Sequence, residues 1–271
     1  MTKTMPMPMP MPMTMPMTMA KTVRFTNMIL LLGSLLVAAS APAAQAAPFS
    51  PEQERAIEKL IADYFIANPE KLGDALDSMQ AHYQAQEKQR LAQTMEESAD
   101  ALYRTASDFT LGPVDAPITI VEFFDYNCGY CKRALTPLMQ TLDENDDVRL
   151  VFKELPILSD SSRVAATTAL ALDDPLTFLS YHTKLMTHQG SVTQTVIDKT
   201  LTELNLSPKA IAKKAQSADI AKAIEATSQL AGRLGINGTP AFIINGEIYP
   251  GALKAADLTA ALVKARKELT N

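Results

Sequence analysis

Two helical segments open the patterned part of the chain. Apolar residues recur every three or four positions between residues 56 and 65, which predicts an amphipathic helix. Ser50-Pro51-Glu52-Gln53 supplies its start, because the serine can cap the helix, the proline suits the first turn and the glutamine completes a capping box. Asn68-Pro69-Glu70 repeats this start signal, and the lack of proline from there to Arg104 predicts a second, much longer helix.

The apolar stripe of the second predicted helix is interrupted. It consists of Leu72, Leu76, Met79 and Tyr83, then the polar Gln86 and Arg90, then Leu91, Met95 and Leu102. A helix with such a gap fits a core poorly and suits water or a loose coiled coil. We interpret residues 47–106 as an N-terminal helical arm for oligomerisation. The alternative is a helical hairpin that packs on the rest of its own chain.

A second domain, residues 107–271, begins with a turn-rich segment and the β-prone run from Ile118 to Phe124. Lys132-Arg133-Ala134-Leu135, with further apolar residues at helical spacing to Leu142, predicts a helix after this strand. Val148 to Lys153 predicts a second strand. A strand, a helix and a strand in so short a stretch form a right-handed unit with parallel strands.

The remaining pattern predicts an insertion and a hairpin. Residues from about 161 to 235 are helical in pattern, with helix starts expected at Ser162, Asp174-Pro175, Ser191 and Ser207-Pro208. Strands on either side of Asn245-Gly246 predict a hairpin with a type I′ turn, and residues 253–269 predict a closing helix. The expected fold class is α/β, with a mixed sheet of four or five strands, parallel at its centre and antiparallel at one edge, and an inserted helical subdomain.

The first 46 residues have the features of an export signal. A Met-Pro-Thr repeat ends at Met19, which can be the true start of translation, and a short positive stretch then precedes the apolar run from Met28 to Ala39. Ala44-Gln45-Ala46 resembles a cleavage site, so we expect cleavage after Ala46 and export to an oxidising compartment. An uncleaved membrane anchor is the alternative. The net charge of −5 does not suggest a nucleic-acid partner.

Cys128 and Cys131, the only cysteines of the chain, lie at the turn between the predicted strand and helix. Unpaired amides at a helix start stabilise an anion, so the pKa of Cys128 should fall below that of a free thiol and make it the attacking sulfur. Cys131 would resolve mixed disulfides, and the pair needs no other cofactor. The alternatives are a static disulfide or half of a metal site. No second cysteine pair exists, and His82, His182 and His188 show no ligand spacing to the motif. We expect His182 and His188, on one predicted helix, to be surface or partly buried polar residues and not ligands.

A Cys-x-x-Cys between strand and helix, with Thr239-Pro240 directly before the hairpin, is the pattern of the thioredoxin fold. The long insertion makes the chain resemble the DsbA-like group. Val-Glu-Phe-Phe-Asp-Tyr-Asn-Cys-Gly-Tyr-Cys-Lys-Arg and Phe-Lys-Glu-Leu-Pro-Ile-Leu are most similar to the suppressor of copper sensitivity protein C (ScsC) type. The resemblance implies a cis peptide bond before Pro240, with the Thr239 backbone free to bind substrate beside Cys128. Tyr130, between the two sulfurs, should also contact substrate.

Two charged residues on the predicted strands complete the candidate site. Alternation turns Glu122 inward, under the cysteine pair, and the resemblance implies that this acid relays the proton of Cys131. A lone buried carboxylate is costly, so either Lys153 on the neighbouring strand pairs with Glu122 or the pKa of Glu122 rises. The alternative is a structural pair without a kinetic role.

The family resemblance also implies a function. Similar proteins are periplasmic disulfide isomerases, trimeric through an N-terminal arm and kept reduced by a membrane partner. We therefore expect a periplasmic homo-oligomer, preferably a trimer, joined through residues 49–106. Its electron donor would be a membrane thiol reductase, and its substrates would be exported proteins with non-native disulfides.

The residues around the cysteines favour isomerase activity over oxidase activity. Gly-Tyr between the cysteines and Thr239 before Pro240 are similar to DsbC isomerases, whereas Pro-His and Val are usual in DsbA oxidases. Two alternatives stay open. One is a monomeric DsbA-like dithiol oxidase, and the other is a Cu(I)-binding periplasmic protein, since soft thiolates suit Cu(I) and the resembled family is linked to copper tolerance.

Overall fold

The computed structural model describes residues 49–270. The export signal, its cleavage after Ala46 and the alternative start at Met19 lie outside these residues. The described part falls into two units, one ending at Tyr64 and one beginning at Phe65. Between residues 49 and 270, no helix combines the length and the apolar character needed to cross a bilayer.

The N-terminal helices follow the predicted start signals. In α1 (Pro51–Ala67) the capping box is confirmed, because the Ser50 amide donates to Gln53 Oε1 (2.8 Å) and the Gln53 amide to Ser50 Oγ (3.3 Å). The next segment is not the single helix expected to Arg104. It divides at Ser98 into α2 (Pro69–Glu97) and α3 (Ala99–Tyr103).

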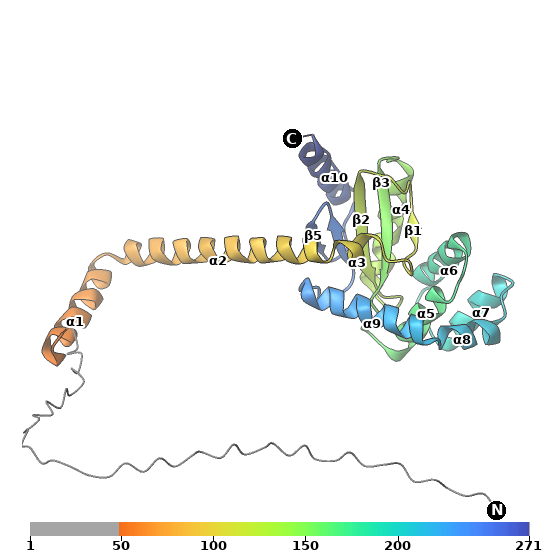
Figure 1. Ribbon diagram of the computed structural model, residues 1–271, viewed down its shortest axis with the longest axis horizontal. Helices are drawn as coiled ribbons and strands as arrows, with labels where there is room; N and C mark the ends of the chain where they lie inside the picture. Colours follow the sequence, from red (N-terminus) through yellow and green to blue (C-terminus); the bar gives the residue numbers. More distant parts are fainter. Residues whose placement is uncertain (1–48, 271) are drawn as a thin grey trace, which may run out of the picture. The chain divides into compact units, whose positions relative to one another are not determined.

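Five strands form one sheet in the order β1-β3-β2-β4-β5 (Figure 1). They are β1 (Thr110–Leu111), β2 (Ile118–Phe124), β3 (Val148–Glu154), β4 (Ala241–Ile244) and β5 (Glu247–Pro250). The central pair β2 and β3 is parallel, and every other neighbouring pair is antiparallel. The sheet is therefore antiparallel at both edges, because the two-residue β1, which the turn-rich sequence hid, pairs with β3.

The β4–β5 hairpin has the predicted turn. Asn245 and Gly246 both have positive φ angles, 48° and 78°, which is the backbone of a type I′ turn. The closing helix α10 (Ala255–Leu269) follows two residues later than predicted.

The two faces of β2 enter two separate cores. Ile120 and Phe124 lie in one core with Cys131 of α4 (Gly129–Asp143) and with Cys128, the residue before this helix. Val121 and Phe123 lie in a second core with Met95 of α2, Leu102 of α3 and Leu230 of α9 (Ala218–Arg233). Because neighbouring side chains of a strand point to opposite faces, one face of β2 packs under the cysteines and the other packs against α2, α3 and α9.

The insertion between β3 and β4 contains five helices, α5 (Asp160–Leu170), α6 (Pro175–Thr187), α7 (Gln194–Glu203), α8 (Pro208–Ala215) and α9 (Ala218–Arg233). The helices α5 to α8 pack against one another (Figure 1). Asp174 and Ser207 cap their helices as predicted, but Ser159 and Thr193 replace Ser162 and Ser191, and Ser217 caps a start that the sequence did not reveal.

A buried ion pair joins β3 to the segment that precedes the sheet. Lys153 is 1% exposed, and its ammonium forms an ion pair with Asp108 and donates to the carbonyl of Ala101. Arg149, four residues earlier on β3, donates to the carbonyl of Tyr103 (2.6 Å). The two basic residues of β3 therefore anchor α3 and the residues that follow it.

Removal of Lys153 should destabilise the protein strongly. The change Lys153→Met leaves Asp108 buried without its partner, and losing one member of a buried pair costs about 3–5 kcal/mol. Urea unfolding followed by far-UV circular dichroism measures this loss. The control Lys222→Met removes an exposed pair with Asp219 and should cost less than about 1 kcal/mol. Equal stability of the two variants would contradict the anchoring role of Lys153.

Candidate functional site

Cys128 is the N-cap residue of α4. Its Sγ accepts a hydrogen bond from the amide of Cys131 (3.2 Å), so the sulfur lies where the helix start stabilises negative charge. Its thiol also donates to the carbonyl of Thr239 (3.1 Å) from across the site. Both cysteines are free thiols in this structure.

The surroundings of Cys128 favour its thiolate. Hydrogen bonding from the Cys131 thiol, opposed by burial and helped by Thr239 and by backbone amides, lowers the pKa of Cys128 to about 6. The Thr239 hydroxyl is buried and has no other partner among the described residues, so it is available to this sulfur. At neutral pH Cys128 is therefore mostly an attacking thiolate.

Cys131 has the opposite character. It is only 1% exposed, and burial, the Cys128 sulfur and the Glu122 carboxyl raise its pKa far above that of a free thiol. The two sulfurs thus differ in charge at the same pH, because one lies at the helix start and the other within the core. A group that removes the Cys131 proton would be needed before this sulfur could react.

The predicted substrate-binding residues surround Cys128. The Thr239–Pro240 peptide bond is cis, as the resemblance implied, and it lies at the start of β4. Tyr130 is 62% exposed, and the Arg133 guanidinium lies 4.2 Å from the centre of its ring. The redox sulfur, the Thr239 carbonyl and an exposed aromatic ring are thus brought to one surface.

Glu122 is buried on the same face of β2 as the cysteine core. It is 2% exposed, and burial together with the charge of Cys128 raises its pKa to about 8. A carboxyl with this pKa can exchange a proton near neutral pH, which is what a proton relay requires. The geometry therefore brings Glu122 together with both sulfurs.

The predicted pairing of Lys153 with Glu122 is wrong. In the parallel register Glu122 lies opposite Phe152, and Lys153 lies opposite Phe123, so the two charged side chains point to opposite faces of the sheet. Lys153 pairs with Asp108 instead. Of the two outcomes expected for a buried Glu122, the structure therefore favours the raised pKa.

Asn127, to which the sequence pattern assigned no role in catalysis, contacts the insertion. Its Nδ2 lies 3.0–3.2 Å from the hydroxyls of Ser159, Ser161 and Ser162, and its Oδ1 accepts from the amide of Val192 (2.7 Å). The residue before Cys128 is thus held by the start of α5 and by the loop before α7. These serines lie far from Asn127 in the sequence, so the sequence pattern did not predict the contact.

Two more side chains link the cysteine turn to the insertion. Asp125 accepts from the amides of Asn127 (2.7 Å) and Leu158 (3.0 Å). Lys132, one residue after Cys131, donates to the carbonyls of His188 and Gly190, both at 2.8 Å. The insertion therefore positions the turn that carries the reactive sulfur.

A second buried carboxyl lies at the end of β3. Glu154 is 4% exposed, and burial raises its pKa well above the ordinary value. Its Oε1 accepts from the Tyr126 hydroxyl (3.0 Å), whereas its Oε2 has no partner among the described residues. A protonated Glu154 would hold Tyr126, two residues before Cys128, within the core.

His182 is fully buried, whereas a surface or partly buried position was predicted. It is 1% exposed among aromatic rings, and burial lowers its pKa to about 3, so it is neutral. Within residues 49–270, no three His, Cys, Asp or Glu side chains are grouped to hold a metal ion.

Comparison with known proteins supports this interpretation. A family model described as thioredoxin matches residues 104–264. Na(+)/H(+) antiporter NhaA 1 of Salinispora arenicola is 28% identical over 164 residues, which are 58% of this chain. Disulfide bond formation protein D of Bacillus subtilis is 26% identical over 150 residues, or 51% of this chain. The match spans 24% of the antiporter and 68% of the Bacillus protein, so only about a quarter of the antiporter is shared.

Two solved structures share both sequence and fold with this chain. A Proteus mirabilis ScsC variant with a deleted linker is 28% identical, with a TM-score of 0.62, over 82% of this chain and 99% of that one. A periplasmic thioredoxin-like protein from Salmonella enterica serovar Typhimurium is 31% identical, with a TM-score of 0.57, over 62% of this chain and 94% of that one.

Alkylation should detect the acidic sulfur. Because the pKa of Cys128 is about 6, its rate of reaction with iodoacetamide should reach half its maximum near pH 6. Mass spectrometry of the reduced protein measures this rate at each site. In the control Cys128→Ser, the remaining thiol of Cys131 should react far more slowly at pH 7. A midpoint near pH 8.5 for Cys128 would contradict the proposed stabilisation.

The change Glu122→Gln should alter the pH dependence of stability. Unfolded Glu122 ionises near pH 4.5 and the folded group near pH 8. Between these values the folded state retains a proton that the unfolded state has lost, so this group lowers stability as pH rises. Relative to the parent, the variant should therefore gain up to about 4 kcal/mol between pH 4 and pH 8.5.

Urea unfolding of the reduced protein at both pH values measures this gain. The control Glu144→Gln, at an exposed position at the end of α4, should show no comparable gain. A constant difference between Glu122→Gln and the parent would show that the pKa of Glu122 is the same in the folded and unfolded states, which would contradict its raised pKa.

Proposed function

This chain belongs to the thioredoxin family, in its DsbA-like, ScsC-type branch, and on that premise we propose that it is a periplasmic thiol-disulfide oxidoreductase that works as a disulfide isomerase and reductase. The observation that carries the proposal is the contrast between the two sulfurs. Cys128 is acidic at the start of α4, whereas Cys131 is buried and protonated behind it. Cys128 can therefore attack a substrate disulfide, while Cys131 remains a protonated thiol.

The first step is attack on a substrate disulfide. The Cys128 thiolate forms a bond to one substrate sulfur, the substrate S–S bond breaks, and the second substrate sulfur leaves as a thiolate. For isomerisation, a substrate thiolate then attacks the mixed disulfide and releases Cys128 unchanged. The carbonyl of Thr239, beside Cys128, is placed to bind an extended substrate segment during these steps.

Reduction of the substrate needs Cys131 as a thiolate. Glu122, with a pKa of about 8, takes the proton of Cys131 in this proposal. The Cys131 thiolate then attacks Cys128, which leaves the Cys128–Cys131 disulfide and a reduced substrate. Two electrons from a membrane thiol reductase return the pair to the dithiol form. Lys153 has no part in this step, because it lies on the opposite face of the sheet.

The Thr239 hydroxyl favours the Cys128 thiolate, which is the form that attacks a substrate disulfide. Exported proteins with non-native disulfides are the proposed substrates. Exposed Tyr130 beside the sulfur is proposed to contact them.

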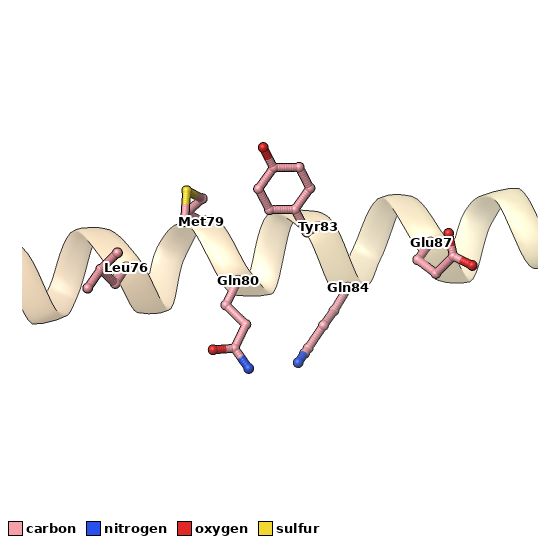
Figure 2. Close-up of a pocket in the computed structure, with 6 residues that line it drawn as sticks. All are labelled: Leu76, Met79, Gln80, Tyr83, Gln84 and Glu87. Carbon is pink, nitrogen blue, oxygen red and sulfur yellow. The ribbon is translucent and has the colours of Figure 1, made fainter.

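We further propose that the N-terminal helices assemble copies of this chain into a homo-oligomer, preferably a trimer. On α1, Leu60 and Tyr64 are 70% and 52% exposed. On α2, Figure 2 shows Met79 and Tyr83 pointing to one side of the helix and Gln80 and Gln84 to the other. Exposed apolar side chains with helical spacing suit the seam of a coiled coil.

Two alternatives predict different behaviour. A DsbA-like oxidase would be monomeric and oxidised in cells. A Cu(I)-binding protein would need the two thiols as ligands, because soft sulfur suits this ion. Cys131 is 1% exposed, which makes the pair poorly accessible as a copper site and favours thiol exchange.

Refolding of scrambled ribonuclease should separate isomerase from oxidase activity. The reduced protein should restore ribonuclease activity, because Cys128 attacks wrong disulfides and releases rearranged ones. The change Cys128→Ser should abolish this activity and insulin reduction, whereas Cys131→Ser should abolish insulin reduction and leave trapped mixed disulfides. Failure of the reduced parent protein to recover ribonuclease activity would remove the isomerase role. Insulin reduction by Cys128→Ser at the parent rate would remove the exchange mechanism itself.

Charge introduced on the exposed apolar side of α2 should weaken the oligomer. Met79→Glu combined with Tyr83→Glu should lower the assembly mass, because like charges would meet at the seam between copies. The control Gln80→Glu with Gln84→Glu adds the same charge on the other side of the helix. Size-exclusion chromatography with light scattering measures both, and deletion of residues 47–90, which stops before the buried Met95, should give a monomer. An unchanged number of chains after that deletion would refute assembly through the arm.

A further inference from the structure

A groove of about 520 Å³ opens beside the cysteine pair, between the start of α4 and the loop that joins β5 to α10. Thr239, whose carbonyl accepts from the Cys128 thiol, lies at its edge, so a segment in this groove would pass next to the reactive sulfur. Tyr130, Pro137 and Leu253 also line the groove and can pack against side chains of an extended peptide.

The charges of this groove are of one sign. Its two charged lining residues are Arg133 and Lys254, both exposed, on opposite sides of the groove. In the part of the chain that the structure describes, neither forms an ion pair. The nearest acid in sequence, Asp257, accepts from the backbone amide of Lys254 (2.9 Å) and lies outside the lining. Both cations are therefore available to a bound molecule.

The position of Arg133 is restricted. Its guanidinium lies over the ring of Tyr130 at 4.2 Å, a cation–π contact that keeps the charge beside the redox turn. This arrangement contrasts with the chain as a whole, which carries a net charge of −5. A cationic groove attracts an acidic partner, whereas the acidic remainder of the protein surface repels it, so such a partner is directed to the groove.

We propose that this groove selects substrate segments with acidic residues next to the cysteine that Cys128 attacks. The inference rests on the proposed thiol exchange and names the substrate class of that same site. Arg133 and Lys254 bind carboxylates of the substrate, while Thr239 pairs with its backbone. Neither cation takes part in the transfer of the disulfide, so they govern selection among substrates and the exchange chemistry is unchanged.

Two synthetic peptides test the proposal. Each contains one cysteine, protected as a mixed disulfide with thionitrobenzoate and flanked by two Glu residues in one peptide and by two Lys residues in the other. Attack of Cys128 on the peptide sulfur releases the coloured thionitrobenzoate and gives a second-order rate constant. The reduced protein should react about tenfold faster with the acidic peptide, and 0.5 M salt should reduce this preference several-fold.

Charge reversal then identifies the residues responsible. Arg133→Glu combined with Lys254→Glu should abolish or invert the preference. The control Lys209→Glu with Lys213→Glu makes the same change in net charge at exposed positions of α8 and should keep the preference. A preference that survives reversal in the groove, or that is lost equally in the control, would overturn the proposal while leaving thiol exchange intact. Absence of reaction with both peptides would instead refute the proposed function.

Discussion

Burial of β2 on both faces is the constraint on which the rest of this structure depends. Six of the seven residues of the strand are buried, and each must point either to the cysteine core or to the core under α3 and α9. The strand therefore leaves no freedom in register, since a shift by one residue would exchange the two sets. Because the register of β2 is fixed, the position of the turn after Phe124 is fixed as well, and this turn places Cys128 at the start of α4.

The same constraint explains the distribution of buried charge. Glu122 and Glu154 lie with the cysteine core. Among the described residues neither forms an ion pair, and burial raises the pKa of both. Lys153 and Asp108 lie on the other face and neutralise each other. The sheet thus separates a pair that stabilises the fold from carboxyls that hold protons beneath the sulfurs.

Much of this arrangement could be predicted from local patterns. The capping box at Ser50, the Asn245-Gly246 turn and the Cys-Gly-Tyr-Cys turn each involve residues that are close in sequence, so their geometry is contained in a short segment. The partner of Lys153 could not be predicted in this way, because it depends on the register between β2 and β3 and on a segment 45 residues earlier. Two-residue β1 was equally hidden, since so short a strand has no alternation of its own.

The opposite pKa shifts of the two thiols also determine how the site reacts with an oxidant. A peroxide reaches Cys128 first and converts its thiolate to a sulfenic acid, which readily condenses with a neighbouring thiol. Cys131, 1% exposed and one helical turn away, is that neighbour, and its attack yields water and the disulfide of the normal cycle. Cys131 therefore protects Cys128 from irreversible oxidation to sulfinic and sulfonic acids, and an oxidised molecule can be recovered by reduction.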